Sequence, residues 1–162
     1  MIYNDNTKNN NTKLINKGEK FMTITIENRD LFTMPQGYYL AHCISADFTL
    51  GAGIAKTFDD VYNMKFKLYR NYPDYEYNGG DALPIDNVFN LVTKQKYWHK
   101  PTYNSLREAL FMMRDQIEFL GATKLAMPWI GCGLDRLERD QVYDIICAVF
   151  EGMDINIVIC EL

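Results

Sequence analysis

The chain has few of the residues that build metal centres or disulfide frameworks. Its 162 residues include two histidines and four scattered cysteines, with no C-x-x-C pair. Structural zinc sites take four such ligands at close spacing. Cys147 and Cys160 lie in apolar segments, where cysteine is typical of a small core residue. We therefore expect reduced thiols, no disulfides and no metal.

Long apolar runs and a basic charge balance are also missing. No run approaches the roughly 20 apolar residues of a membrane span, and the first residues show no signal-peptide apolar segment. The formal net charge of −4 argues against a generally basic nucleic-acid-binding protein. These absences predict a cytoplasmic protein without membrane contacts, and we expect a monomer.

Hydrophobic residues make up 48% of the chain, enough for the core of one domain. Residues 1–21 are rich in Asn and Lys without sustained periodicity, which predicts a flexible, solvated tail. Residues 22–162 form the predicted folded domain.

Strand and helix patterns alternate through this domain. The predicted strands are 23–27, 38–44, 80–86, 88–94, 123–130 and 155–161, and the predicted helices are 53–70, one after Pro101 that stops at Gly121, and one with an apolar stripe over 142–150. Such alternation predicts an α/β sandwich with a largely parallel sheet. Ligands in such sheets bind at the carboxyl ends of the strands.

The stretch AHCISADFTLGAGIAKTF, residues 41–58, places Gly51, Ala52 and Gly53 directly before a predicted helix. The first N–H groups of a helix are unpaired and attract anions, so the stretch fits a phosphate site. It fits equally a tight strand-to-helix turn that binds nothing. His42, inside the strand, is typical of a core residue with its hydrogen bonds satisfied.

Polar residues follow two further predicted strands. Lys94 follows one, and Gly131, Cys132, Gly133 and Asp135 follow the other. Two glycine turns, each leading into a helix, can cradle a diphosphate. Each residue also has a structural interpretation. Lys94, taken alone, fits a solvated basic loop.

Asp135 has its own structural interpretation. It stands three residues before Glu138, the spacing of a capping box, and spacing alone favours that role for Asp135 over catalysis.

Tyr97, Trp98 and Tyr103 are interleaved with lysines at 94, 96 and 100. Aromatic residues among basic ones provide a stacking surface of the kind that binds single-stranded nucleic acid. The alternative is an ordinary exposed loop.

Taken together, four stretches resemble the macrodomain family, in the branch of the terminal ADP-ribose protein glycohydrolase. They are AHCISADFTLGAGIAKTF (41–58), LVTKQKYWHKPTY (91–103), LAMPWIGCGLDRLER (125–139) and INIVICEL (155–162). The resemblance covers nearly all of 22–162 and implies a three-layer α/β/α fold with a mixed, largely parallel central sheet. It also implies ADP-ribose binding without a cofactor.

The resemblance assigns roles residue by residue. It implies that Lys94 attacks the anomeric carbon of the terminal ribose and that Asp135 acts on the resulting intermediate. We expect Asp135 to move a proton when substrate arrives rather than to hold a static ion pair. The implied ligand-binding residues are Asp30, Leu31, His42, Ser45, Gly51, Ala52, Gly53, Ile54, Thr93, Ile130, Gly131, Cys132, Gly133, Leu134 and Leu162, with Asp30 at the adenine amino group.

Two residues depart from the family pattern. Arg29 stands where a glycine usually precedes the aspartate, and Cys160 stands where the human-type enzyme has a tyrosine near the adenine pocket. Arg29 is expected to narrow the adenine end of the ligand pocket or to change its polarity. Cys160 removes the aromatic ring that the family's tyrosine places near that pocket.

The implied function is hydrolytic removal of ADP-ribose from Glu/Asp-modified protein or from ADP-ribosylated DNA. Hydrolysis of ADP-ribose 1″-phosphate is the alternative enzyme activity. A non-catalytic ADP-ribose reader is the alternative from another class.

Overall fold

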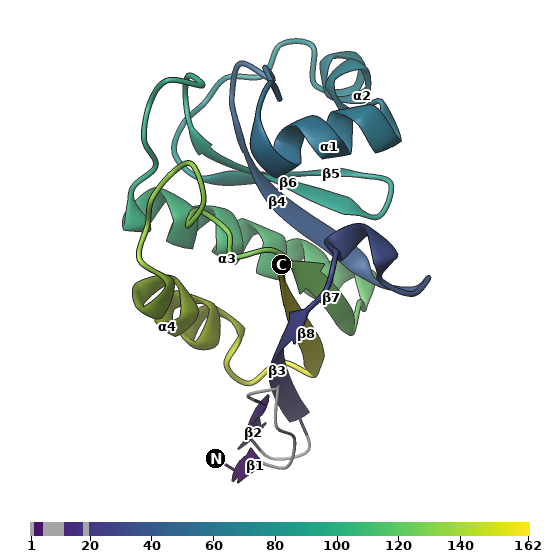
Figure 1. Cartoon of the computed structure of the whole chain (residues 1–162), viewed down its shortest axis with the longest axis vertical. Helices are drawn as coiled ribbons and strands as arrows, with labels where there is room; N and C mark the ends of the chain where they lie inside the picture. Colours follow the sequence, from purple (N-terminus) through teal and green to yellow (C-terminus); the bar gives the residue numbers. More distant parts are fainter. Residues whose placement is uncertain (1, 5–11, 18–19) are drawn as a thin grey trace.

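The computed structural model describes residues 2–4, 12–17 and 20–162, with helices on both faces of one sheet (Figure 1). Within these residues the sheet has eight strands in the order β1-β2-β3-β8-β7-β4-β6-β5. The strands are β1 (Ile2–Asn4), β2 (Thr12–Lys17), β3 (Lys20–Asn28), β4 (Tyr39–Ser45), β5 (Asp81–Ile85), β6 (Val88–Lys94), β7 (Lys124–Met127) and β8 (Ile155–Glu161). The helices are the 3₁₀ turn η1 (Leu31–Thr33), α1 (Gly53–Tyr62), α2 (Met64–Asn71), α3 (Tyr103–Leu120) and α4 (Arg139–Phe150).

The five neighbouring strands β3, β8, β7, β4 and β6 all run parallel. The remaining pairings, β1 with β2, β2 with β3 and β5 with β6, are antiparallel. This confirms the predicted α/β fold with a mixed, largely parallel sheet. Because the parallel strands share a direction, their carboxyl ends meet along one edge of the sheet.

The two faces of the sheet bury separate apolar clusters. Helices α3 and α4 cover one face, where Leu106, Leu110, Met113 and Ile117 are fully or almost fully buried, as their spacing predicts. Helices α1 and α2 cover the other face. Leu120, expected on the same stripe of α3, is 49% exposed because it lies in the last turn of the helix.

The predicted helix over 53–70 is two helices. Asn63 separates α1 from α2 with a left-handed φ of 56°, a conformation that asparagine tolerates better than most residues. Asp59 spans the break, since its backbone oxygen accepts from the Asn63 N–H at 2.9 Å and its side-chain Oδ1 accepts from the Lys65 N–H at 2.9 Å. The pattern of apolar residues is helical on both sides, so periodicity alone does not show the break.

The segment predicted as a solvated tail contributes strands. Ile2–Asn4 and Thr12–Lys17 pair in turn beside β3, which itself begins at Lys20 rather than after Met22. An edge strand presents unpaired N–H and C=O groups that another strand can satisfy without any hydrophobic pattern. Residues 1, 5–11 and 18–19 of the predicted tail lie outside the described residues.

None of the helices in the described part of the chain has the length and apolarity of a membrane span.

Candidate active site

A cavity of about 650 Å³ lies where the carboxyl ends of β4, β6 and β7 meet the start of α1. It brings together most of the residues that the sequence predicted for the site. Those residues are Ser45, Gly51, Ala52, Gly53, Ile54, Lys94, Ile130, Gly131, Gly133, Leu134 and Asp135.

The loop from β4 to α1 presents backbone N–H groups to this cavity. Helix α1 begins at Gly53, and its N-cap residue Ala52 offers no side-chain cap. The first N–H groups of the helix are therefore left for a ligand, and they attract an anion. Gly53 has a φ of 59°, where an L side chain is strained, and an added Cβ would lie 3.3 Å from Leu134 Cδ1.

Asp47 holds this loop in shape. Its Oδ1 accepts hydrogen bonds from Ser45 Oγ at 2.5 Å and from the Thr49 N–H at 3.2 Å, and its Oδ2 accepts from the Tyr97 N–H at 3.0 Å. Burial disfavours the charged carboxylate, but these hydrogen bonds outweigh burial and hold the pKa of Asp47 below its ordinary value. Asp47 thus ties the β4–α1 loop to the loop after β6.

Two apolar residues of the same loop adopt left-handed backbone conformations. Phe48 has a φ of 52° and Leu50 a φ of 44°, and both side chains are buried. Such conformations are costly for bulky residues and persist where the surroundings fix them. The strained loop positions Leu50 in the wall of the cavity.

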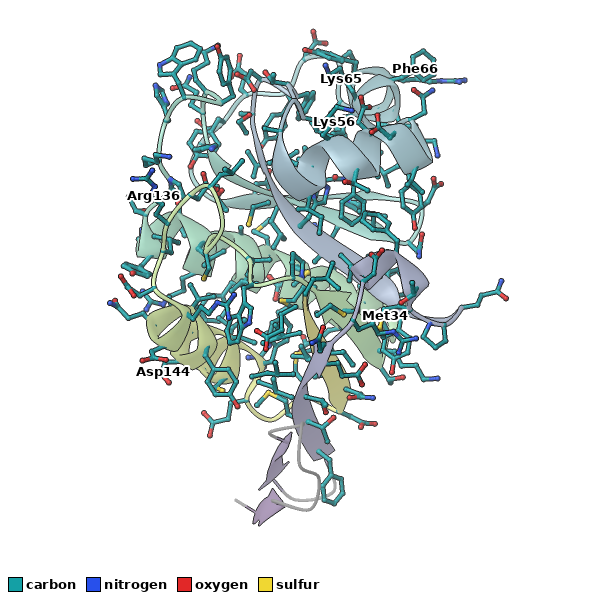
Figure 2. All side chains as sticks on the ribbon, in the orientation of Figure 1. Met34, Lys56, Lys65, Phe66, Arg136 and Asp144 are labelled. Atoms are coloured by element: carbon teal, nitrogen blue, oxygen red, sulfur yellow. The ribbon has the colours of Figure 1, made fainter. Side chains whose placement is uncertain are left out.

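The loop after β7 is closed by its own backbone. The Leu137 N–H donates to Gly131 O at 2.7 Å, and the Arg136 N–H donates to Gly133 O at 3.2 Å. Gly131 has a φ of 72°, a left-handed conformation that L side chains rarely adopt, so the tight turn favours glycine. Arg136, with a φ of 62°, lies at the outer edge of the molecule (Figure 2).

The second glycine loop does not lead directly into a helix, which corrects the sequence prediction. Helix α4 begins only at Arg139, and its N-cap residue is Glu138. Asp135 therefore does not cap the helix, contrary to the interpretation that its spacing favoured. The intervening residues fold into the closed turn, which points the Asp135 side chain at the cavity instead.

Lys94 and Asp135 form an ion pair in the cavity wall. Lys94 Nζ donates to Asp135 Oδ1 at 2.7 Å, and the two side chains are only 14% and 15% exposed. Shielding from water strengthens such a pair relative to a surface salt bridge. This ion pair corrects the expectation from the sequence that Asp135 holds no static ion pair with Lys94.

Neighbouring groups complete this end of the site. Lys100 Nζ donates to the backbone oxygen of Leu134 at 3.0 Å, so the loop after β6 braces the glycine loop after β7. Cys43 also lines the cavity. Burial, with the charge of Asp135 adding to it, raises the pKa of the Cys43 thiol to about 12, so this thiol is no nucleophile near neutral pH.

His42 is not brought to the cavity and lies in the core. It is fully buried, its Nε2 lies 2.6 Å from Asn90 Oδ1, and its ring stacks on Phe58 at 3.9 Å between centroids. Alternation along β4 explains this placement, because Cys43 and His42 point to opposite faces of the sheet. The core interpretation of His42 therefore holds over the ligand-binding one.

Five other predicted ligand residues do not line the cavity: Asp30, Leu31, Thr93, Cys132 and Leu162. Asp30 caps η1, where its Oδ1 accepts from the Phe32 N–H at 3.0 Å, and Leu31 is buried behind it. Thr93 lines a smaller neighbouring cavity of about 240 Å³. Leu162 is 93% exposed.

The two departures from the family pattern have defined contacts. Arg29 donates through its Nε to Thr33 Oγ1 at 3.1 Å and through NH2 to Thr33 O at 2.9 Å, and it reaches Glu27 at 3.4 Å. Its guanidinium is therefore held along η1. Cys160 is 5% exposed and packs in the core.

Several cavity residues were not among the predicted ligand-binding residues, although Tyr97 and Lys100 were predicted to belong to a stacking surface. They are Cys43, Ile44, Thr49, Leu50, Ala55, Tyr97, Lys100, Pro128 and Trp129. Most are apolar and carry no chemical signature. Their position at strand ends was the available signal, since Pro128 and Trp129 directly follow β7 and Ile44 is the last residue but one of β4.

Comparison with known proteins shows the family of the chain. No protein-family model matches the chain. The ADP-ribose glycohydrolase OARD1 of Bos taurus is 38% identical over 151 residues, covering 91% of this chain and 97% of that protein. The chain belongs to the OARD1 family of ADP-ribose glycohydrolases. OARD1 of Homo sapiens is 37% identical over 152 residues, with the same coverage of both chains.

Solved structures agree on the fold of this OARD1-family chain. The macrodomain of Thermus aquaticus DarG superposes with a TM-score of 0.73 at 18% identity, covering 87% of this chain and 99% of that one. The macrodomain of Mycobacterium tuberculosis DarG gives 0.73 at 19% identity, with 86% and 97% covered. Thermosipho africanus DarTG, solved in complex with ADP-ribose, gives 0.66 at 18% identity, with 91% and 43% covered. The fold is that of a macrodomain.

Proposed function

We propose that this OARD1-family protein hydrolytically removes ADP-ribose from modified macromolecules, with Lys94 as the nucleophile and Asp135 as the acid–base group. The observation that carries the proposal is the ion pair of Lys94 and Asp135, 2.7 Å apart in the wall of a 650 Å³ cavity. The names of the relatives support the reaction class, and ADP-ribose in the Thermosipho africanus structure supports the ligand.

The diphosphate is held between the two glycine loops. The open N–H groups at the start of α1 face one side of the cavity, and the loop around Gly131 and Gly133 faces the other. Backbone donors of this kind bind phosphate oxygens without a metal ion or an arginine. The terminal ribose then lies toward Lys94.

In the first step the amine of Lys94 attacks the anomeric carbon. A lysine is a poor nucleophile while it is protonated, so its proton passes to Asp135, which is already hydrogen-bonded to it. A C–N bond forms between Lys94 and the ribose as the bond from the anomeric carbon to the leaving oxygen breaks. With a Glu- or Asp-linked substrate, the leaving group is the carboxylate of the modified protein, which takes the proton from Asp135 and leaves Asp135 as a carboxylate for the second step.

In the second step water releases the lysine. Asp135 accepts a proton from the water as it adds to the anomeric carbon, and it returns a proton to the departing amine. The products are free ADP-ribose and the restored Lys94–Asp135 pair. One carboxylate beside one amine is sufficient for both proton transfers.

The substrate assay compares three compounds with purified protein: Glu/Asp-modified protein, single-stranded DNA with an ADP-ribosylated base, and ADP-ribose 1″-phosphate. We expect turnover of a macromolecular substrate. If ADP-ribose 1″-phosphate were the only compound turned over, the proposal would be wrong and the protein would have the alternative enzyme activity. Binding of free ADP-ribose without any turnover would identify a reader.

Variants test the roles of the pair. Lys94→Ala should lower turnover by about 10³-fold or more, with ADP-ribose affinity little changed, because the amine acts on the anomeric carbon and not on the diphosphate. Lys96→Ala is the matched control on the same loop, where the side chain is exposed and does not line the cavity. Wild-type rates in Lys94→Ala would rule out the nucleophile.

Asp135→Asn gives a second, independent readout. At alkaline pH, where hydroxide takes the Lys94 proton that Asp135 takes in the wild-type protein, the variant still lacks the group that activates water for release. A lysyl–ADP-ribose adduct should then accumulate and be detectable by intact-mass spectrometry. The adduct should be absent from the double variant that also lacks Lys94.

That the protein is cytoplasmic and monomeric stays a prediction. Light scattering after gel filtration measures the oligomeric state.

A further inference from the structure

The strand order arranges the ends of five strands along one line. From one side to the other these positions carry Asp30 after β3, Glu161 on β8, Trp129 after β7, Ser45 on β4 and Lys94 on β6. At about 4.8 Å between neighbouring strands, the line from β6 to β3 is about 19 Å long.

The proposed function gives this line a direction, and the inference rests on it. The reacting ribose lies at Lys94 on β6, and the diphosphate lies between the loops that follow β4 and β7. The adenosine part must therefore extend farther along the line, toward the ends of β8 and β3. Trp129 stands where this part of the ligand begins.

Trp129 is the aromatic residue on that side of the cavity. Among the described residues, the cavity lining holds two aromatic side chains, Tyr97 and Trp129. Tyr97 belongs to the loop after β6, on the Lys94 side. A purine bound toward β8 thus has Trp129 as its available stacking partner.

The Trp129 ring is held in place from two other elements. Its Nε1–H donates to Glu161 Oε2 at 2.7 Å, and Arg139 NH1 donates to the same oxygen at 3.0 Å. The Arg139 guanidinium carbon also lies 5.3 Å from the centre of the indole ring, a cation–π arrangement. The Glu161 backbone oxygen in turn accepts from the Arg29 N–H at 2.8 Å, next to Asp30.

This arrangement is suited to ligand contact. The polar N–H of the indole is satisfied, and the half-buried Trp129 is one of the residues that line the cavity, with the Tyr143 ring 6.3 Å from the indole ring between centroids. A ring that is already fixed loses little entropy when a ligand packs on it. We infer that Trp129 packs against the adenine ring of ADP-ribose, and that Glu161 is the residue that positions it.

Intrinsic fluorescence tests the contact directly, because the chain has two tryptophans. Trp98→Phe leaves Trp129 as the single tryptophan; Trp98 is 63% exposed and does not line the cavity. Titrating this variant with ADP-ribose, and separately with ADP, should change its emission in proportion to binding. Trp129→Phe, in which Trp98 alone emits, should show no change when ligand binds.

Calorimetry on the same proteins measures the energetic effect. Trp129→Ala should weaken ADP-ribose and ADP by the same factor, about 5- to 100-fold, the range expected for loss of one base–aromatic stack. Trp129→Phe should lose less, since it keeps an aromatic face. If Trp129→Ala does not fold, the fluorescence titrations and Trp129→Phe still decide the question.

Glu161 variants test the positioning role. Glu161→Ala should weaken binding and reduce the emission change of Trp129, whereas Glu161→Gln keeps an acceptor oxygen and should restore both. The inference would be overturned if Trp129→Ala bound ADP-ribose with unchanged affinity and the Trp129 emission of Trp98→Phe did not change on binding. The proposed function would still stand in that case if the wild-type protein turned over its substrate. If the wild-type protein neither binds nor releases ADP-ribose, the proposed function fails first.

Discussion

His42 should make the fold sensitive to mild acid. Asn90 Nδ2 donates to Leu83 O at 3.1 Å, so its Oδ1 faces His42 as an acceptor and the imidazole carries its proton on Nε2. The other ring nitrogen, Nδ1, is buried and has no hydrogen-bond partner among the described residues. A second proton would therefore create a buried charge with an unpaired N–H, and burial lowers the pKa of His42 from 6.5 to about 4.

The sign of the effect follows from linkage. Between pH 6.5 and 4 the unfolded chain binds a proton at His42 that the folded protein excludes, so the free energy of unfolding falls as the pH falls. The contribution is fully present above pH 6.5. The loss is about 2 kcal/mol at pH 5 and approaches roughly 3 kcal/mol below pH 4.

Urea unfolding at pH 7.5, 6, 5 and 4.5 measures this dependence. Carboxylates also titrate in this range, so the informative quantity is the difference between the wild-type protein and His42→Gln, which keeps a donor for Asn90. We expect the variant to lose about 2 kcal/mol less than the wild type between pH 7.5 and 5. His99→Gln, which removes the exposed second histidine, is the control and should follow the wild type. Parallel curves for wild type and His42→Gln would refute the reasoning.

Three further predictions concern the loops and the core. Gly53→Glu should abolish ADP-ribose binding in calorimetry, because a carboxylate would occupy the diphosphate site; Gly121→Glu, with a similar φ of 67° outside the cavity, should keep binding despite comparable backbone strain. Cys43, with its pKa raised to about 12, should react with iodoacetamide at pH 8 about 10³-fold more slowly than in urea, as peptide mass spectrometry can measure. Gly80→Ala should lower the free energy of unfolding by about 1–3 kcal/mol or more, since its Cβ would overlap the backbone oxygen of Ser105. Unchanged urea midpoints would contradict that packing.

The sequence by itself determined the fold class and the main elements. The apolar stripe of α3 and its stop at Gly121, the buried strands β6 and β8, and the glycines before α1 are local patterns that the structure reproduces. These features are readable because they depend on neighbours three, four or two positions apart. Lys94 and Asp135 were named only through the resemblance of their motifs to the macrodomain family, because the residues alone favoured a solvated loop for Lys94 and a cap for Asp135.

Tertiary structure decided how these elements meet. Asp135 contacts Lys94, 41 positions away, and not the N-terminus of α4, because the glycine turn closes on Leu137 first. His42 faces the core because its strand alternates, and Trp129 reaches the cavity with Glu161 and Arg139 behind it only after β7 and β8 pair. Local patterns set the conformation of each segment, whereas the partners of a side chain depend on strand order and loop closure, which bring together residues that no sequence spacing connects.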